Sequence, residues 1–337
     1  MVSHGYTGHI HVESLFVQRM NTSAPGKLFL TGEYAVLEGA PALVMPVPQR
    51  AIVSSACSDR WIIRSDVEVA LPMQEIPLAK AVYDELHRRG LPVSVPEDGL
   101  CLDTRAFFQS IDGEPKKLGV GGSAALTAAL LKTLFPKPTG WADSEYVRLA
   151  VACHHRFQGG LGSGADIAVA LMDDLIRYRT VAEPEVSSLP HGLVFGFVWT
   201  GRGAGTVSYL DRMLRFKERE PTLYDELMHP LGRVATSMSR RGLRADEFIG
   251  GLAEMDICLK ALSDGSRTGF YTDIHVELRD FVMRSGGIYK PSGAGGGDFG
   301  MVVVREVGEL RALNEKLENA GYRTDLVSAD RFIQESE

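Results

Sequence analysis

The chain has 337 residues, 45% of them hydrophobic and 23% charged, which is typical of a globular protein long enough for two domains. Its formal net charge is −7, which argues against nucleic acid as a partner because nucleic acid needs a basic face. The four cysteines are far apart and form no C-x-x-C pair, so we expect a cytoplasmic protein without a zinc or disulfide framework. We expect no membrane partner, because no apolar run approaches the roughly 20 residues of a membrane helix.

Residues 1–20 lack a basic start followed by an apolar core, so they do not form a signal peptide. This stretch contains His4, His9 and His11, which could in principle bind a metal. We expect instead that it is a disordered leader.

Residues 21–56 contain two short apolar runs, 28–30 and 42–47, separated by turn residues, and this pattern predicts strand, turn, strand. Lys27 follows an Ala-Pro-Gly sequence that fixes the backbone and aims the side chain. Position alone leaves two interpretations of this lysine open, a solvated residue at a strand start or a functional group. Glu33 lies at the far side of the first turn.

Residues 61–113 carry weaker signals. Residues 61–63 and 67–71 resemble strands, and residues 101–111 return to a strand-like pattern. Between them, residues 79–89 are amphipathic and end at Gly90, which predicts a helix with a glycine stop.

The stretch KKLGVGGSAALTAALL, residues 116–131, is a glycine-rich loop followed by good helix formers. The first turn of a helix has amide groups without internal partners and the positive end of the dipole, so we predict a phosphate site. Ser123 can offer its hydroxyl to a metal or a phosphate, and Lys116 and Lys117 add positive charge. The alternative is a plain strand-to-helix turn. The Walker A and dinucleotide fingerprints both fail on spelling.

Residues 144–158 predict another helix, which Gly159 and Gly160 end. The sequence GGLGSGADIAVALMDDLIRYR follows, a second loop of glycine and serine that opens into a helix. Asp166 lies in the first turn of that helix. Two compatible interpretations are a carboxylate stabilised by the helix dipole and a base presented into a cleft.

The composition changes over residues 181–192, which predicts a domain boundary. Beyond it we expect a buried strand at 193–200, helical structure over 222–262, and a helix that ends within 279–285. Residues 307–326 are expected to form a helix and a short strand.

The stretch KPSGAGGGDFGMVVV, residues 290–304, gathers glycines ahead of a valine-rich strand. Ordering so many glycines costs backbone entropy, which implies a close approach of the main chain to something, most simply phosphates. Gly295, Gly297 and Gly300 spell G-x-G-x-x-G, but they precede a strand instead of opening a helix, so a dinucleotide site is excluded by context.

The strings PGKLFLTGEYAVLEG, KKLGVGGSAALTAALL and KPSGAGGGDFG, in this order, resemble the three signature motifs of the GHMP small-molecule kinases over about residues 22–320. The resemblance implies an α+β GHMP kinase fold. Its N-terminal ribosomal-protein-S5-like domain would cover residues 21–185 and its C-terminal ferredoxin-like domain residues 186–337, with the active site between them.

Within the superfamily, GEYAVLEG, HHRFQGGLGSGADIAVA and WTGRGAGT are most similar to the phosphomevalonate kinases. That family uses ATP and Mg²⁺ to convert (R)-5-phosphomevalonate to 5-diphosphomevalonate in the mevalonate pathway of isoprenoid biosynthesis. The alternatives are a mevalonate kinase, a less well matched diphosphomevalonate decarboxylase, and a non-catalytic family member that binds a ligand and regulates. A monomer or a homodimer is expected.

The resemblance also implies roles for single residues. Lys27 and Asp166 match the catalytic lysine and aspartate, Ser123 would lie near Mg²⁺, and the adenine pocket would involve residues 61–110. Residues implied at the ATP phosphates are Lys117, Gly119, Val120, Gly121, Gly122, Ser123 and Ala124. Residues implied at the acceptor are Lys27, His155, Arg156, Ser163, Gly164, Ser292, Gly293, Ala294 and Gly295.

The sequence departs from the family pattern at two places. Gly122 stands where the family usually has the first serine of GLGSS, so one hydroxyl near the phosphates is missing. The stretch CHHRFQGG has no carboxylate where mevalonate kinases place a Mg²⁺-binding glutamate. His154, His155 and Arg156 would make this place positive, which favours an acceptor that already bears a phosphate. The alternative is that these side chains lie on the solvent face of their helix.

Overall fold

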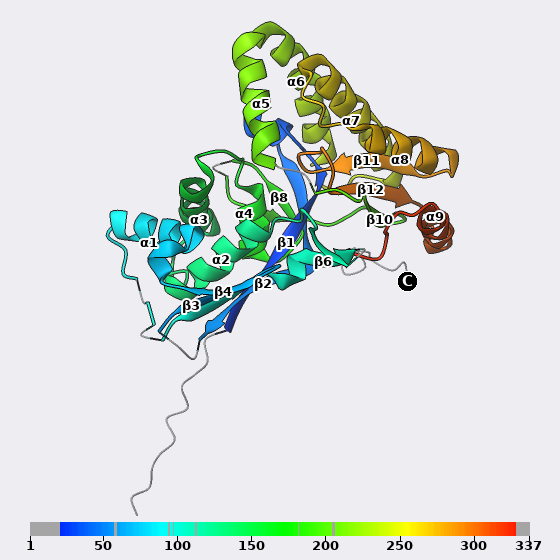
Figure 1. The fold of residues 1–337 in the computed structure, drawn as a ribbon. Helices are drawn as coiled ribbons and strands as arrows, with labels where there is room; N and C mark the ends of the chain where they lie inside the picture. The colour runs from blue at the N-terminus through cyan, green and yellow to red at the C-terminus, as the bar shows by residue number, and fades with distance from the viewer. Residues whose placement is uncertain are drawn as a thin grey trace, which may run out of the picture.

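The structure is a computed structural model that describes residues 21–56, 59–93, 95–96, 98–111, 113–180, 182–203 and 206–327. The predicted leader, residues 1–20, lies outside this part. The described residues form a seven-stranded sheet and a three-stranded sheet, each with its own helices, and a two-stranded hairpin (Figure 1).

The larger sheet is built around one long strand. Its strands are β1 (Asn21–Thr31), β2 (Ala42–Ser55), β3 (Trp61–Arg64), β4 (Glu68–Leu71), β5 (Leu100–Asp103), β8 (Ile176–Tyr178) and β9 (Glu185–Val186). Strand β1 pairs antiparallel with β2 along nearly its whole length. Strands β5 and β8 pair with opposite ends of β2, so β2 holds the two halves of the sheet together.

Four helices cover one face of this sheet (Figure 1). They are α1 (Pro77–Arg88), α2 (Gly122–Leu134), α3 (Asp143–Gln158) and α4 (Ala165–Met172). Helix α2 lies in the middle, and nearly all of its side chains are buried. It can be surrounded because its sequence is alanine and leucine on every side, as is typical of a helix inside a core. The helices predicted from apolar periodicity and glycine stops are therefore confirmed.

The residues before α2 form a hairpin that the sequence pattern did not indicate. Strand β6 (Phe108–Ile111) pairs with β7 (Glu114–Lys117), so Lys117 lies on an exposed strand ahead of the glycine-rich loop. Short 3-10 turns occur at η1 (Ala35–Glu38), η2 (Met73–Glu75) and η3 (Arg105–Phe107).

The smaller sheet has the order β10-β12-β11 and is antiparallel throughout. Its strands are β10 (Val194–Trp199), β11 (Ile288–Ser292) and β12 (Phe299–Val304). Trp199 also forms an isolated antiparallel bridge to Arg323 on the free side of β10. This order, with helices between β10 and β11 and after β12, is the ferredoxin-like topology, and the predicted fold class is confirmed. The short strand expected near the end of 307–326 is reduced to that single bridge.

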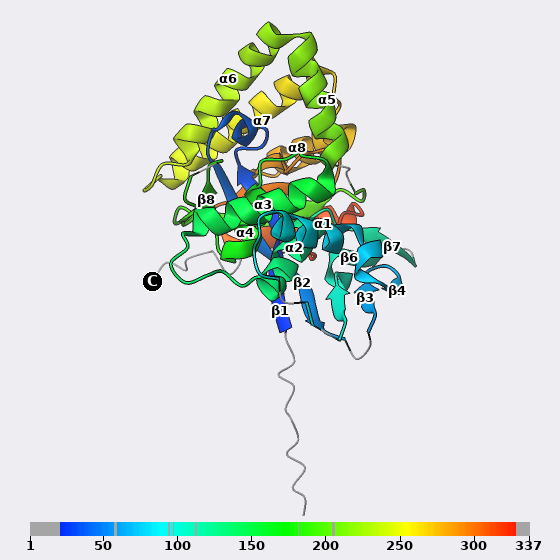
Figure 2. The same ribbon diagram turned by 90° about the vertical axis from the view of Figure 1, so that its left-hand side faces the viewer.

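Five helices of the described residues accompany the smaller sheet, and the last three of them contact its strands most closely. The five helices are α5 (Thr206–Arg219), α6 (Pro221–Met238), α7 (Ala245–Ser266), α8 (Asp273–Arg284) and α9 (Val307–Asn319). The stretch 222–262, predicted to be helical throughout, breaks into α6 and α7, which pack against each other (Figure 2). The chain turns at Gly242, whose φ of 72° suits glycine better than other residues. No helix in the described ranges is long and apolar enough to cross a membrane.

The two sheets meet at a buried ion pair. Glu33, just after β1, accepts a hydrogen bond from the Nζ of Lys290 on β11, and the side chains are 1% and 0% exposed. Two more bonds flank this pair: Ser292 Oγ donates to the carbonyl of Phe29 at 2.8 Å, and Tyr34 OH donates to the carbonyl of Ala294 at 2.6 Å. The ends of β1 and β11 are therefore fixed against each other.

Lys290→Met should destabilise the protein by about 3–5 kcal/mol, because it leaves the Glu33 charge buried without its partner. The double variant Glu33→Gln with Lys290→Met should recover most of this loss. Lys260→Met, in the solvent-exposed pair with Asp264, should cost about 1 kcal/mol or less. Urea unfolding of the four proteins measures the difference. Equal losses for Lys290→Met and Lys260→Met would contradict the role of the buried pair.

Candidate active site

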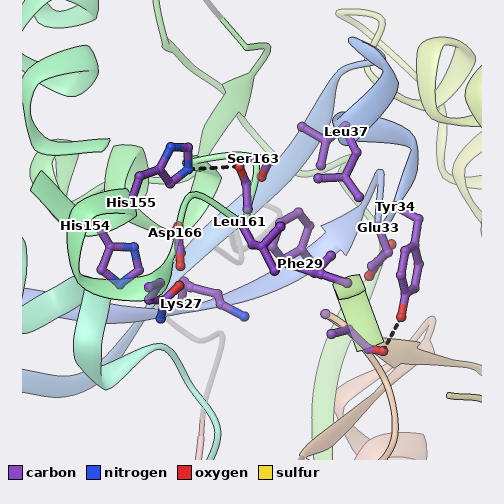
Figure 3. Close-up of a pocket in the computed structure, with 17 residues that line it drawn as sticks. Lys27, Phe29, Glu33, Tyr34, Leu37, His154, His155, Leu161, Ser163 and Asp166 are labelled. Atoms are coloured by element: carbon purple, nitrogen blue, oxygen red, sulfur yellow. Dashed lines mark hydrogen bonds between the residues drawn. The ribbon is translucent and has the colours of Figure 1, made fainter. Parts of the chain in front are cut away.

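A cavity lies where β1, the end of α3, the start of α4 and the loop after β11 come together (Figure 3). Its lining residues are Lys27, Phe29, Glu33, Tyr34, Val36, Leu37, His154, His155, Gln158, Leu161, Gly162, Ser163, Gly164, Asp166, Leu210, Gly293 and Ala294. The predicted acceptor-side residues Lys27, His155, Ser163, Gly164, Gly293 and Ala294 are all in this set.

Lys27 is held between two of the glycine motifs. Its backbone N donates to the carbonyl of Val120 at 2.8 Å, which ties β1 to the glycine-rich loop. A Cβ atom at Gly121 would lie 3.1 Å from Lys27 Cγ, and one at Gly293 would lie 3.4 Å from Nζ. The two glycines therefore leave the space in which the lysine side chain lies, and they direct its ammonium group into the cavity.

Asp166 faces the same cavity from the first turn of α4 (Figure 3). Gly164, with φ of 83°, allows the sharp turn into the helix. One carboxylate oxygen of Asp166 accepts the backbone N–H of Ile167 at 2.9 Å. Burial, together with the nearby Asp166 charge, raises the pKa of Tyr178 to about 12. The structure thus brings Lys27 and Asp166, 139 positions apart in the sequence, to one cavity.

Two glycines of the 116–131 loop, Gly119 and Gly122, also have a packing role that was not predicted. A Cβ at Gly119 would lie 1.9 Å from Asp298 Oδ1, and a Cβ at Gly122 would lie 3.0 Å from the Phe107 ring. Protein side chains occupy the space that a Cβ at these two positions would need. The first-turn amides of α2 still have no partner inside the helix, so phosphate binding there stays a prediction.

The remaining residues predicted at the phosphates are placed as follows. Val120 and Ala124 are buried, so only their backbone is available, and Lys117 is exposed on β7. Ser123 Oγ accepts a hydrogen bond from Gln158 Nε2 at 3.2 Å, and it lies 3.2 Å from His154 Nε2. Ser123 is therefore joined to the cavity through two residues that line it.

Three residues predicted at the acceptor do not line the cavity. The hydroxyl of Ser292 is engaged by the Phe29 carbonyl. Gly295 packs against the backbone of Phe270, where a Cβ would lie 2.6 Å from the carbonyl oxygen. Arg156 points toward α1, with NH1 3.5 Å from the Glu85 carboxylate.

The predicted positive patch on α3 is not present in the cavity. Burial lowers the pKa of His154, which is 3% exposed, so this ring is neutral at neutral pH. Arg156 is 42% exposed and pairs with Glu85 outside the cavity. Only His155 of the three predicted residues lines the cavity and is not buried. Helix phase explains the difference, because three successive residues of a helix point in three directions.

Residues 80–174 match the family model for the GHMP kinases N terminal domain. The chain is 25% identical to a phosphomevalonate kinase of Streptomyces sp. (strain CL190), covering 83% of this chain and 88% of that protein. It is 27% identical to a mevalonate kinase of Archaeoglobus fulgidus, covering 68% and 76%. A structure of the Streptococcus pneumoniae phosphomevalonate kinase in complex with phosphomevalonate and AMPPNP aligns with a TM-score of 0.70 at 20% identity, covering 91% of this chain and 98% of that one.

Residues 80–174 therefore carry a GHMP kinase N-terminal domain. The resemblance to the GHMP kinases, the fold and the phosphotransferase class predicted from the three motifs are confirmed. The domain boundary at residue 186 stays a prediction. It falls inside β9 (Glu185–Val186), which pairs with β8 in the larger sheet, ahead of β10 in the smaller one.

The structure of the kinase also shows polar cavity residues to which sequence reasoning gave no role. Glu33 has one buried carboxylate oxygen, Oε2, without a hydrogen-bond partner among the described residues. Tyr34 has a positive φ of 58°, unusual for a tyrosine, and burial raises its pKa well above the ordinary value. Both residues belong to the GEYAVLEG string, and this string is the sequence feature that could have pointed to them. Gln158 follows His154 by one helical turn, a spacing that puts the two on one face of α3.

The cavity and its surroundings offer few protein ligands for magnesium. The described residues contain no group of three or more His, Cys, Asp or Glu side chains that could hold a metal ion. Mg²⁺ commonly takes only one or two protein carboxylates and fills its shell with phosphate oxygens and water. Asp166 and Ser123 supply oxygens of the required kind, whereas the α3 residues that line the cavity, His154, His155 and Gln158, supply no carboxylate.

Gly119→Ala should destabilise the kinase more than Gly113→Ala, although both glycines have a similar positive φ of 75° and 81°. The shared backbone strain costs about 1–2 kcal/mol. Nothing lies within 4 Å of a Cβ at Gly113, whereas Gly119 would meet Asp298 and lose roughly 1–3 kcal/mol more by overpacking. Urea unfolding measures both variants. Equal losses would show that the Asp298 contact is easily displaced.

Proposed function

We propose that this kinase transfers the γ-phosphoryl group of ATP to (R)-5-phosphomevalonate and forms 5-diphosphomevalonate. The observation that carries the proposal is the convergence of Lys27 and Asp166 on one cavity that the loop 161–164 also lines, with the backbone of Lys27 bonded to the glycine-rich loop ahead of α2. The curated relatives and the solved structure named above are phosphomevalonate and mevalonate kinases, which supports an acceptor of this class.

In this proposal the protein acts by positioning and by charge neutralisation, as is general for phosphoryl transfer. The first-turn amides of α2 and the Ser123 hydroxyl bind the nucleotide phosphates. Lys27 stabilises the charge of the transferring group, since its ammonium enters the cavity between the two glycine motifs. Asp166 orients Lys27 and the acceptor from the opposite wall. The loop 161–164 and the residues Gly293 and Ala294 hold the acceptor.

Magnesium would be held by the nucleotide phosphates together with the oxygens of Asp166 and Ser123. When bound, it would neutralise charge on the phosphates and add to the effect of Lys27. The neutral His154 contributes no charge of its own at neutral pH. Compared with a glutamate at this place, it removes a negative charge that would repel a phosphorylated acceptor.

Mevalonate kinase is the second candidate, and one observation favours it. Among the described residues that line the cavity, Lys27 is the one lysine or arginine, and several of the others are apolar, such as Phe29, Val36 and Leu37. An acceptor without a phosphate needs fewer cations. Turnover of mevalonate, phosphomevalonate and diphosphomevalonate, followed by ADP formation in a coupled assay, separates the candidates. We expect turnover of phosphomevalonate, and turnover of mevalonate alone would overturn the proposal.

Lys27→Met should lower kcat by about 10²–10³-fold, because one preorganised donor to the transferring group is lost. Lys316→Met, on the exposed face of α9, serves as the control and should change kcat less than about twofold. Steady-state kinetics with saturating ATP measures both variants. An unchanged kcat for Lys27→Met would show that this lysine is structural.

Asp166→Asn separates the two acceptors by its pH dependence. A phosphate monoester with a second pKa of about 6 is already ionised at neutral pH. With phosphomevalonate, log(kcat/KM) should therefore rise up to about pH 6 and stay level above it, and Asp166→Asn should lower that level without moving the rise. An alcohol acceptor must lose its proton, so loss of a base would cost about 10²–10⁴-fold. A limb of the pH profile that disappears in Asp166→Asn would contradict the phosphomevalonate proposal.

A further inference from the structure

Two adjacent histidines at the end of α3 hold two different loops. His154 Nε2 lies 3.2 Å from the hydroxyl of Ser123, at the start of α2. His155 Nε2 lies 3.1 Å from the carbonyl oxygen of Gly162, in the loop that leads into α4 (Figure 3). Successive side chains on a helix point about 100° apart, so neighbouring residues can reach different segments. One turn of α3 therefore contacts the start of α2 on one side and the loop that leads into α4 on the other.

On the first side, the Ser123 hydroxyl is held by two partners. Gln158 lies four residues after His154 on the same face of α3, and its side-chain amide donates to Ser123 Oγ at 3.2 Å. A serine hydroxyl has one donor and two acceptor positions, and His154 and Gln158 occupy two of these three. His154 is 3% exposed, so its ring has little contact with water. These two contacts fix the direction in which the third hydrogen-bonding position of the Ser123 hydroxyl points.

On the second side, the loop 161–164 contains two glycines with a positive φ, Gly162 and Gly164. Such a segment loses much conformational entropy when it becomes ordered. Two of its carbonyl groups have side-chain donors. The carbonyl of Ser163 accepts from Tyr178 OH at 2.8 Å, and the carbonyl of Gly162 accepts from His155. A carbonyl only accepts, so His155 bears its proton on Nε2 and fixes one peptide of the loop.

We propose that His154 and His155 are positioning residues that serve the two substrates separately. His154 acts on the nucleotide through Ser123, and His155 acts on the acceptor through the loop 161–164. This inference rests on the proposed function, which assigns the first loop to the phosphates and the second to the acceptor. The rigid last turn of α3 then keeps the two substrates in a constant relation.

The same substitution at neighbouring positions tests the separation. His154→Phe keeps the volume and loses the contact to Ser123, so the KM for ATP should rise about three- to tenfold while the acceptor KM changes less than about twofold. His155→Phe should do the reverse. Titration calorimetry with ATP in EDTA, without acceptor, should show the weaker binding for His154→Phe alone. Changes in the same KM for both variants would overturn the proposal.

A double-mutant cycle tests whether His154 acts through Ser123. The effect of His154→Phe on ATP binding should largely disappear in the Ser123→Ala background, because the group on which it acts is gone. His154→Gln places a polar nitrogen near the position of Nε2 and should restore ATP binding to within about twofold of the wild type. An equal effect of His154→Phe in both backgrounds, or no rescue by glutamine, would overturn the proposal.

These experiments distinguish the inference from the proposed function. The ATP titration needs no acceptor, and the cycle with Ser123 can be run whichever acceptor is turned over. If mevalonate is the acceptor, the proposed function fails while the ATP effect of His154→Phe and its dependence on Ser123 persist. Thermal unfolding of each variant identifies a folding defect, and His154→Leu, which also loses the contact to Ser123, provides the test should His154→Phe not fold.

Discussion

The buried pair of Glu33 and Lys290 is the interaction on which the cavity depends. Two charges without solvent contact are stable only next to each other, so β1 and β11 can meet in one arrangement and not in a shifted one. The bonds from Ser292 to Phe29 and from Tyr34 to Ala294 repeat the same register on either side. Because Glu33 also lines the cavity, the contact between the two parts of the chain forms one of the cavity walls. A ligand there touches both parts at once.

The glycine motifs also fix how separate segments of the chain pack against each other. At Gly119, Gly121, Gly122 and Gly293, an added Cβ would meet a side chain that comes from a distant part of the chain. Each of these glycines therefore marks a place where two segments cross closely. The contacts of Gly121 and Gly293 with Lys27 matter most for the chemistry, because they direct this flexible side chain into the cavity. A glycine motif can thus be required by close packing between protein segments alone.

Much of this arrangement could be predicted from the sequence. The strands around 28–30 and 42–47, helix α2 and the start of α4 follow from apolar runs and glycine stops, and the order of the three motifs implied one shared site. The remaining features depend on contacts across long separations. Asp298 meets Gly119 only through the folded crossing, and Arg156 faces α1 because Glu85 lies there. The burial of His154 depends on how α3 packs on α2, which a local pattern does not contain.

The choice of acceptor illustrates why the burial of one side chain matters. Mevalonate and phosphomevalonate differ only at the end that reacts, so the protein can discriminate between them only near Lys27, Asp166 and His154. The sequence suggested that His154 adds positive charge, but a buried neutral ring adds none. A neutral ring does, however, avoid the repulsion that a carboxylate would cause. Two like unit charges 4 Å apart repel each other by about 1 kcal/mol in water and about 4 kcal/mol near a protein surface. In the proposed function, a phosphorylated acceptor beside the ATP phosphates would be tolerated because α3 places no carboxylate there, and not because it places a cation there.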